Sequence, residues 1–325
     1  MSEITITGRK RLALLSGRAH PELAEEIAEL LGTTLVPTTA YDFANAETFV
    51  RFEESVRGVD AFVIQAHPAP VNHWIIEQLL MLDALKRASA KRVTVISPFF
   101  PYARQDKKHK GREPISARLM TDLYAAAGAN RIMSVDLHTP QIQGCFDGPV
   151  DHLWALPMLS DFVAANYGEE KLTVVSPDSG RVRVADIWAD RLGAPLAIVH
   201  KRRDPDVPNQ VTAHELVGDV KGRTCLLVDD MIDTAGTIVA AAAALKKNGA
   251  AKVIVAATHA IFSGPAVERL SSDAVDAVVV TNTLPIGPEK RFEGLTVLSI
   301  APLIAKAISA VFDDDSVNSL FPGHA

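Results

Sequence analysis

The stretch 224–247, TCLLVDDMIDTAGTIVAAAAALKK, constrains the fold more than any other part of the chain. Residues 225–228 form an apolar run that predicts a buried strand, and the alanine-rich run from about Thr237 predicts a helix. Two adjacent carboxylates, Asp229 and Asp230, stand between them. A strand that passes into a helix through a short loop is a βα unit, which indicates an α/β protein with a parallel sheet.

The loop at 231–236 has the composition of an anion-binding site. Its small residues let a phosphate approach the backbone, and the N–H groups of the first helical turn point outward with the helix dipole behind them. Two threonines add hydroxyl donors. The segment therefore predicts a cradle for a phosphate monoester, formed by Asp233, Thr234, Ala235, Gly236 and Thr237.

Asp229 and Asp230 need a separate reason, because carboxylates beside a phosphate repel it. The 2′- and 3′-hydroxyls of a ribose are donors that a carboxylate pair can accept. We interpret the two aspartates as ligands of sugar hydroxyls, and the loop as the cradle of a 5-phosphate. The alternative is a solvated acidic turn in which Asp233 or Thr234 caps the helix. The residues that follow at 233–237 favour the ligand site.

Length and composition allow two domains and disfavour several classes of protein. The chain has 325 residues, of which 48% are hydrophobic and 22% charged, so it can bury sizeable cores. Its formal net charge of −6 argues against a general nucleic-acid binder, and no apolar run has the length of a membrane span. Cys145 and Cys225 share no metal-ligand spacing, and the N-terminus lacks a secretory pattern. We expect a cytoplasmic protein.

Strands and helices alternate along the chain in a pattern that recurs in its two halves. We predict α/β halves with parallel sheets flanked by helices, and ligands at the carboxyl ends of the strands. The predicted strands are 11–16, 61–65, 92–97, 172–176, 196–199, 225–228, 252–257 and 277–282, with a further strand before Asp136 and another from Leu295; the main helices are 21–31, 71–86, 237–247 and the segment that ends at Phe312.

A basic loop directly follows the strand at 92–97. It is either a solvated surface loop or a contact surface for a triphosphate, and Gln105 within it could hydrogen-bond a base or a ribose. The cations are Arg104, Lys107, Lys108, Lys110 and Arg112.

His138 and Asp178 also follow predicted strands. His138 could ligate Mg²⁺ or contact a nucleotide phosphate, although a hydrogen-bonded turn histidine is slightly favoured by the residues alone. Asp178, with a glycine two residues later, is a metal or ligand position, because Mg²⁺ prefers one or two carboxylates together with substrate phosphates.

Two segments leave alternatives open. The segment 200–210, HKRRDPDVPNQ, is either an ordinary exposed connection or a mobile loop that brings positive charge to a phosphoryl transfer. Phe43 lies in a polar segment, and periodicity alone favours a small hydrophobic plug for it.

Five segments together resemble the ribose-phosphate pyrophosphokinases, also called phosphoribosyl-pyrophosphate synthetases, over essentially the whole chain: YARQDKKHKGREPISARL, DLHTPQIQGCFD, SPDSG, HKRR and VDDMIDTAGT. The resemblance implies transfer of the pyrophosphoryl group of MgATP to the 1-hydroxyl of ribose 5-phosphate. It also implies two related domains of the phosphoribosyltransferase type I fold, 1–153 and 154–308, with the tail 309–325 packing back on the first.

Two other functions share parts of these motifs. A type I phosphoribosyltransferase would explain DTAGT but not YARQD or DLHTPQIQG. A non-catalytic regulatory subunit of the same family is disfavoured by the intact Lys201 and Arg203 and by the intact acidic turn.

The resemblance assigns roles to the motif residues. It implies Lys201 and Arg203 as catalytic residues, and a Mg²⁺ near His138 and Asp178. The ATP site would comprise Phe43, Asn45, Ala46, Glu47, Arg104, Gln105 and His138, and the ribose 5-phosphate site Arg203, Asp229, Asp230, Asp233, Thr234, Ala235, Gly236 and Thr237.

The resemblance also implies an assembly and its regulation. In the family, the segment around Phe43 reaches the adenine of a neighbouring subunit's ATP, which implies a homo-oligomer, usually a hexamer. The sequences REPISARL and SVNSLF are similar to the class that inorganic phosphate activates and ADP inhibits.

Three positions depart from the family pattern. Ser179-Gly180-Arg181 stands where His-Gly-Gly is often found, which affects the expected metal geometry. Ala235 stands where glycine is also common, and His109 where an acid or a small residue is frequent.

Overall fold

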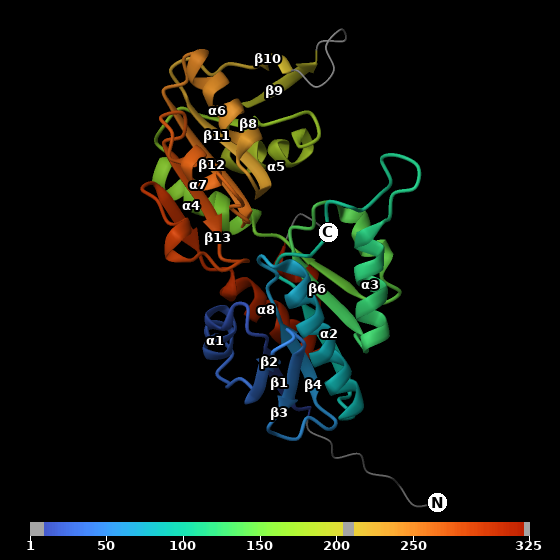
Figure 1. The fold of residues 1–325 in the computed structure, drawn as a ribbon. Coiled ribbons are helices and arrows are strands. Elements are labelled where there is room, and N and C mark those ends of the chain that lie inside the picture. Colours follow the sequence, from blue (N-terminus) through green and yellow to red (C-terminus); the bar gives the residue numbers. More distant parts are fainter. Residues whose placement is uncertain (1–9, 204–210, 322–325) are drawn as a thin grey trace, which may run out of the picture. The chain divides into compact units, whose positions relative to one another are not determined.

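The computed structural model describes residues 10–203 and 211–321, and the chain divides into two compact units. Unit 1 comprises residues 1–153 and 301–325, and unit 2 comprises residues 154–300. Each unit is a predominantly parallel sheet flanked by helices (Figure 1), so the predicted fold class is confirmed. Within the described residues, no helix has the length and apolar character needed to cross a membrane.

The sheet of unit 1 has five strands, and each hydrogen-bonded pair of neighbours is parallel. Across the sheet, the strands lie in the same order as in the chain. In spatial order they are β1 (Leu12–Ser16), β4 (Asp60–Ile64), β5 (Arg92–Ile96), β6 (Arg131–Val135) and β7 (Val150–Leu153).

Helices cover this sheet because alternate strand residues face opposite sides. Helices α2 and α3 share a core with Leu15, Val63 and Val95, among other residues. Helices α1 and α8 pack against each other. Helix α1 also contacts β1, and helix α8 also contacts β7. The helices are α1 (Pro21–Leu30), α2 (Val71–Arg87), α3 (Ser116–Ala127) and α8 (Ala301–Phe312), with the short turns η1 (Pro140–Cys145) and η3 (Val317–Leu320).

Unit 1 also contains a hairpin outside the main sheet and a helix from the end of the chain. An antiparallel hairpin, β2 (Thr38–Asp42) and β3 (Thr48–Phe52), precedes β4. Helix α8 comes from the end of the chain and appears in red among the blue and green elements of unit 1 (Figure 1). The expected boundary at 308 would cut this helix, whereas all of 301–325 belongs to unit 1.

The sheet of unit 2 has seven strands, of which only the edge pair β10–β9 is antiparallel. In spatial order they are β10 (Val211–Val217), β9 (Leu196–Arg203), β8 (Leu172–Ser176), β11 (Thr224–Ile232), β12 (Lys252–Ala260), β13 (Ala277–Thr281) and β14 (Leu295–Leu298); the helices are α4 (Leu156–Tyr167), α5 (Val182–Leu192), α6 (Gly236–Lys247) and α7 (Ala266–Leu270), with the turn η2 (Pro288–Lys290).

The order of strands in unit 2 reverses between β8 and β11. The chain leaves β8 through α5 and returns to β9 on one side, and it leaves β11 through α6 and returns to β12 on the other. Such a switch point opens a crevice at the carboxyl ends of the two strands, where ligands of open α/β sheets bind.

Two strands of unit 2 are longer than predicted. β11 continues to Ile232, because Met231 and Ile232 still pair with β12, so the connecting loop is shorter than the expected 231–236. β9 continues to Arg203, because its second half pairs with β10, a strand that was not predicted.

Candidate functional site

Strand β11 brings the acidic pair to the switch point of unit 2. Its register with β8 ends at Leu227, whereas its register with β12 continues to Ile232. Asp229 and Asp230 lie in this extension, and only 17% and 9% of their side chains are exposed. The two carboxylates therefore lie at the carboxyl edge of the sheet, largely removed from solvent.

Arg181 lies directly before helix α5 and bridges both carboxylates. Its Nε is 3.2 Å from Asp229 Oδ1, and its Nη2 donates to Asp230 Oδ1 at 2.6 Å. The backbone N–H of Asp230 also donates to Asp229 Oδ1, at 2.9 Å. The sequence identified Arg181 only as a departure from a family pattern and gave no sign of this contact.

The acidic pair has unusual electrostatics. Burial raises the pKa of Asp229 well above its ordinary 3.8, and the neighbouring Asp230 raises it further. Arg181 acts in the opposite direction, because its positive charge favours the ionised carboxylate. The protonation state of the pair therefore depends on this arginine.

The predicted phosphate cradle follows at the end of β11. Ala235 occupies the position before α6 with φ 59° and has no polar side chain that could cap the first helical N–H groups. Arg269 of α7 donates to the carbonyl of Thr234 at 2.8 Å, and a Cβ at Gly236 would lie 3.3 Å from Arg269 Nη1. Ser263 N–H donates to the carbonyl of Asp233 at 3.0 Å. These contacts hold the loop at the helix N-terminus, a position at which helices in general favour anions.

In unit 1, the basic loop and the segment that carries His138 are joined. Asp106 Oδ2 accepts hydrogen bonds from Thr139 Oγ1 at 2.8 Å and from Gln141 Nε2 at 2.6 Å. Gln105 Oε1 accepts from Ser116 Oγ at 2.6 Å. The two segments follow β5 and β6, which are neighbours in the sheet. The sequence did not identify Asp106, which links them.

The predicted adenine-binding segment is the turn of the β2–β3 hairpin. Phe43 is 47% exposed and packs edge-on against Tyr41, with ring centroids 5.3 Å apart. Asn45, Ala46 and Glu47 are exposed. The small hydrophobic plug that periodicity alone favoured does not fit this exposure, whereas the ATP-binding role that the resemblance implies stays a prediction.

The remaining predicted residues are less completely defined. Lys201 and Arg203 lie in β9, but their side chains are outside the described part of the structure, as are residues 204–210. His138 and Asp178 are both half-buried and belong to different units. Asp178 Oδ1 accepts from the N–H of Gly180 at 2.8 Å. Among the described residues, no group of three or more His, Cys, Asp or Glu could hold a metal ion.

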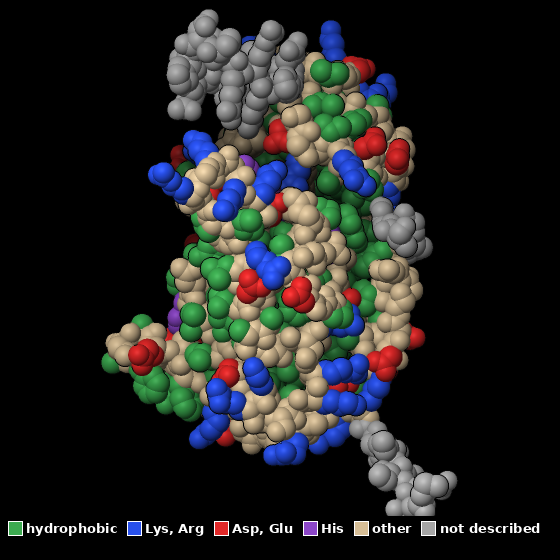
Figure 2. All heavy atoms as spheres, turned by 90° about the vertical axis from the view of Figure 1, so that its right-hand side faces the viewer, with side chains coloured by type: hydrophobic (Ala, Val, Ile, Leu, Met, Phe, Trp, Pro, Cys, Tyr) green, Lys and Arg blue, Asp and Glu red, His purple; other side chains and the backbone are tan. Residues whose placement is uncertain are grey.

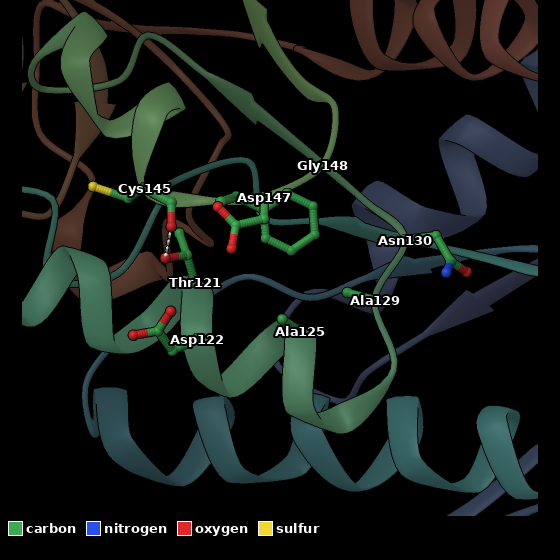
Figure 3. A pocket seen from close by; sticks show the side chains of 9 residues that line it. Thr121, Asp122, Ala125, Ala129, Asn130, Cys145, Asp147 and Gly148 are labelled. Atoms are coloured by element: carbon green, nitrogen blue, oxygen red, sulfur yellow. Dashed lines mark hydrogen bonds between the residues drawn. The ribbon is translucent and has the colours of Figure 1, made fainter.

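Unit 1 also has a surface pocket, whose lining side chains are drawn in Figure 3. Thr121, Cys145 and Asp147 contribute to its wall. Asn130 and Gly148 also line it. Asn130 directly precedes β6, and Gly148 lies two residues before β7, so part of the pocket lies at the amino ends of the strands. None of the predicted site residues lines it.

On one face of the molecule, the distribution of charged side chains is consistent with small anionic ligands. On the face shown in Figure 2, Lys and Arg side chains form small groups interleaved with acidic and uncharged ones, with no continuous basic band. Neutralising a nucleic-acid backbone requires an extended basic surface, which this face lacks.

Two family patterns match the chain. The N-terminal domain of ribose phosphate pyrophosphokinase matches residues 12–128, and the phosphoribosyl synthetase-associated domain matches residues 204–322.

Full-length relatives carry the same name. The chain is 66% identical to the ribose-phosphate pyrophosphokinase of Streptomyces coelicolor over 99% of both chains, and 61% identical to that of Mycobacterium tuberculosis over 100% of both. The crystal structure of phosphoribosylpyrophosphate synthetase from Mycobacterium smegmatis is 60% identical and covers 94% of this chain and 100% of its own, with a TM-score of 0.90.

Proposed function

Because the chain belongs to the ribose-phosphate pyrophosphokinase family, we propose that it transfers the β,γ-pyrophosphoryl group of MgATP to the 1-hydroxyl of ribose 5-phosphate in the cytoplasm. The products are 5-phosphoribosyl 1-pyrophosphate and AMP. The observation that carries this proposal is the 66% identity over 99% of both chains, which extends over both units. A type I phosphoribosyltransferase would not account for a match over both units.

The reaction forms a bond between the 1-oxygen of the sugar and the β-phosphorus of ATP. The bond from the β-phosphorus to the oxygen that bridges it to the α-phosphorus breaks, AMP leaves with that oxygen, and the hydroxyl proton passes to solvent. Positioning and charge neutralisation supply most of the rate in such transfers. We propose that Lys201 and Arg203 neutralise the charge that moves to AMP.

The ribose 5-phosphate site in this proposal is the carboxyl edge of unit 2. Asp229 and Asp230 accept the sugar hydroxyls, and the loop 233–237 with the N-terminus of α6 holds the 5-phosphate. The position of the acidic pair at the switch point and the lack of a side-chain cap hydrogen bond from Ala235, the residue before α6, support this assignment. Arg203 would complete the site.

The ATP site in this proposal combines two parts of unit 1. Arg104, Gln105 and His138 hold one nucleotide, and the Asp106 bridge between their segments supports a shared site. The exposed hairpin residues Phe43, Asn45, Ala46 and Glu47 would contact the ATP of another subunit. An exposed aromatic ring at a hairpin turn is suited to stacking on a base.

We propose His138 of unit 1 and Asp178 of unit 2 as the residues near magnesium, which would also bind ATP phosphates and water. A half-buried carboxylate at a strand end fits the preference of Mg²⁺ for oxygen ligands and few protein groups. When bound, the ion neutralises phosphate charge.

The proposal includes a homo-oligomer, in the family usually a hexamer, regulated by inorganic phosphate and ADP. Exposed apolar side chains on two helices of unit 1 support an assembly, since Ile76 and Leu80 lie on α2 and Leu119 and Leu123 on α3, each pair four residues apart.

The test is AMP release from MgATP by the purified chain, with and without ribose 5-phosphate, at two concentrations of inorganic phosphate. We expect AMP only with the sugar phosphate, and more of it at the higher phosphate concentration. AMP formation without the sugar phosphate, or none at all, would contradict the proposed transfer; the latter would favour a non-catalytic regulatory subunit.

A further inference from the structure

We infer that Arg181 is a positioning residue for ribose 5-phosphate, whose guanidinium holds Asp229 and Asp230 as an oriented pair of acceptors for the sugar hydroxyls. The inference rests on the proposed function and adds to it a cation on which the sugar site depends.

The geometry of the bridge supports this role. A guanidinium presents its N–H donors in a rigid plane, so that one arginine can bind two carboxylates at once. Nε and Nη2 of Arg181 each reach the Oδ1 atom of one aspartate, at 3.2 and 2.6 Å. With the N–H of Asp230 on Asp229 Oδ1, the bridge fixes the orientation of both carboxylates.

The charge of the site requires such a cation. Two adjacent anions that are 17% and 9% exposed have lost most of their hydration, and neutral sugar hydroxyls cannot replace it. The charged groups that act on Asp229 are Asp230 on its own strand and Arg181 from the turn before α5. Arg181 is therefore the counter-charge that favours the ionised carboxylate of Asp229, and its second contact extends to Asp230.

Titratable groups on the surrounding elements have other partners. Asp178, in the turn after β8, directs Oδ1 to the N–H of Gly180. His259 of β12 has its Nδ1 2.9 Å from Thr283 Oγ1. The first turn of α6 contains no acidic residue. Among the described residues, the charges named as acting on Asp229 are those of Asp230 and Arg181.

A competing role for Arg181 would be to block the sugar. A carboxylate has about four acceptor positions, so a bond from Arg181 does not prevent a hydroxyl from binding the same group. The bridge is accordingly compatible with bound sugar, and we expect it to persist in the complex.

The test uses the full-length chain and measures ribose 5-phosphate binding by calorimetry without ATP. Arg181→Gln removes the charge and keeps a hydrogen-bonding side chain. We expect its affinity to fall roughly 10- to 100-fold at neutral pH, the range for losing charge-assisted bonds. Arg181→Lys should recover part of the affinity, because it restores the charge but not the planar fork.

A pH series distinguishes this role from a general loss of structure. Without Arg181 the pKa of Asp229 should rise further, so the pH at which binding is half lost on acidification should move upward. The substrate phosphate itself titrates near pH 6, with a pKa of about 6, but it does so equally for both proteins. The difference between the two curves therefore reports the acidic pair.

Arg191→Gln is the matched control. Arg191 lies in the last turn of the same helix and pairs with Asp161, whose side chain is 71% exposed. The Arg191→Gln variant should bind ribose 5-phosphate with the affinity of the unmodified chain. Equal or tighter binding by Arg181→Gln, or an unshifted pH curve, would overturn the inference. The unmodified chain's AMP assay tests the proposed function separately, since it does not involve the variant.

Discussion

Arg18 in unit 1 and Arg181 in unit 2 occupy comparable positions, but the carboxylates that they bind come from different kinds of source. Arg18 follows β1, the first strand of unit 1, and Arg181 follows β8, the first strand of unit 2; a helix begins shortly after each. Arg18 Nε lies 2.5 Å from Glu77 of α2, and its Nη2 lies 2.7 Å from Asp42 of the hairpin. Arg181 instead binds two adjacent aspartates of one strand.

The comparison shows that the effect of such a bridge depends on whether its two carboxylates come from one element or from two. Because Glu77 and Asp42 belong to separate elements, Arg18 ties α2 and the hairpin to the end of β1. Asp229 and Asp230 need no tie, since they share β11. Their arginine changes the charge and orientation of the pair. We therefore expect the bridge in unit 1 to contribute to stability and the bridge in unit 2 to ligand binding.

The largest expected effect concerns the acidic pair. Replacing both Asp229 and Asp230 by Asn should weaken ribose 5-phosphate binding by about 3–6 kcal/mol, from two charge-assisted hydrogen bonds of about 1.5–3 kcal/mol each. Calorimetry with ribose 5-phosphate measures this change. Asp161→Asn, at an exposed ion pair of unit 2, is the control. Unchanged binding by the double variant would remove the sugar role of β11 and break the comparison.

The next effect concerns the buried carboxylate of the unit 1 bridge. Glu77 is fully buried, and besides Arg18 it accepts a hydrogen bond from Gln65 Nε2 at 2.8 Å. Glu77→Ala should lower the free energy of unfolding by about 3–5 kcal/mol, because it leaves buried donors without their acceptor. Chemical denaturation measures the loss, with Glu22→Ala, at a side chain 78% exposed, as the control. The folded variant should retain its affinity for ribose 5-phosphate; loss of that affinity alone would reverse our assignment.

The stability of the protein should also depend on pH through a buried histidine of unit 1. His67 is completely buried, with Nε2 3.1 Å from Gln78 Oε1, and burial lowers its pKa from 6.5 to about 4. Since the unfolded chain binds the proton more readily, stability is complete above about pH 6.5 and is lost as the pH falls toward 4. The loss should reach about 3 kcal/mol, at 1.36 kcal/mol per pKa unit.

Denaturation at several pH values, compared between the unmodified chain and His67→Gln, measures this contribution. The variant should show a smaller slope between pH 6.5 and 4. The same slope in both proteins would exclude His67 as the source.

The smallest effect concerns the hairpin that Arg18 holds. Phe43→Ala should raise the KM for ATP through the loss of about 1–3 kcal/mol of base stacking, and leave ribose 5-phosphate affinity unchanged. Steady-state kinetics in both substrates measures this division. Leu30→Ala, at another exposed apolar side chain of unit 1, should alter neither value. An effect of Phe43→Ala on ribose 5-phosphate alone would contradict a nucleotide role for the hairpin.

The structure supports the sequence interpretation best where the signal is local. The apolar run 225–228, the two aspartates and the small residues after them lie within one βα unit, so strand propensity and side-chain chemistry were sufficient to predict a strand, an acidic edge and a helix start. Periodicity alone was misleading for Phe43, because it cannot distinguish a plug from the exposed turn of a hairpin.

Tertiary structure decided which distant residues meet. Parallel strands that are neighbours in a sheet come from far apart in the chain, so the sequence cannot show that Arg181 reaches Asp229, 48 positions later, or that Asp106 joins the segment after β6. By itself the sequence determined the strands and helices with the strongest apolar patterns, the chemistry at their ends and the family resemblance. The pairing of β8 with β11 decided that the acidic pair has an arginine as its counter-charge, because only that pairing brings the two strand ends together.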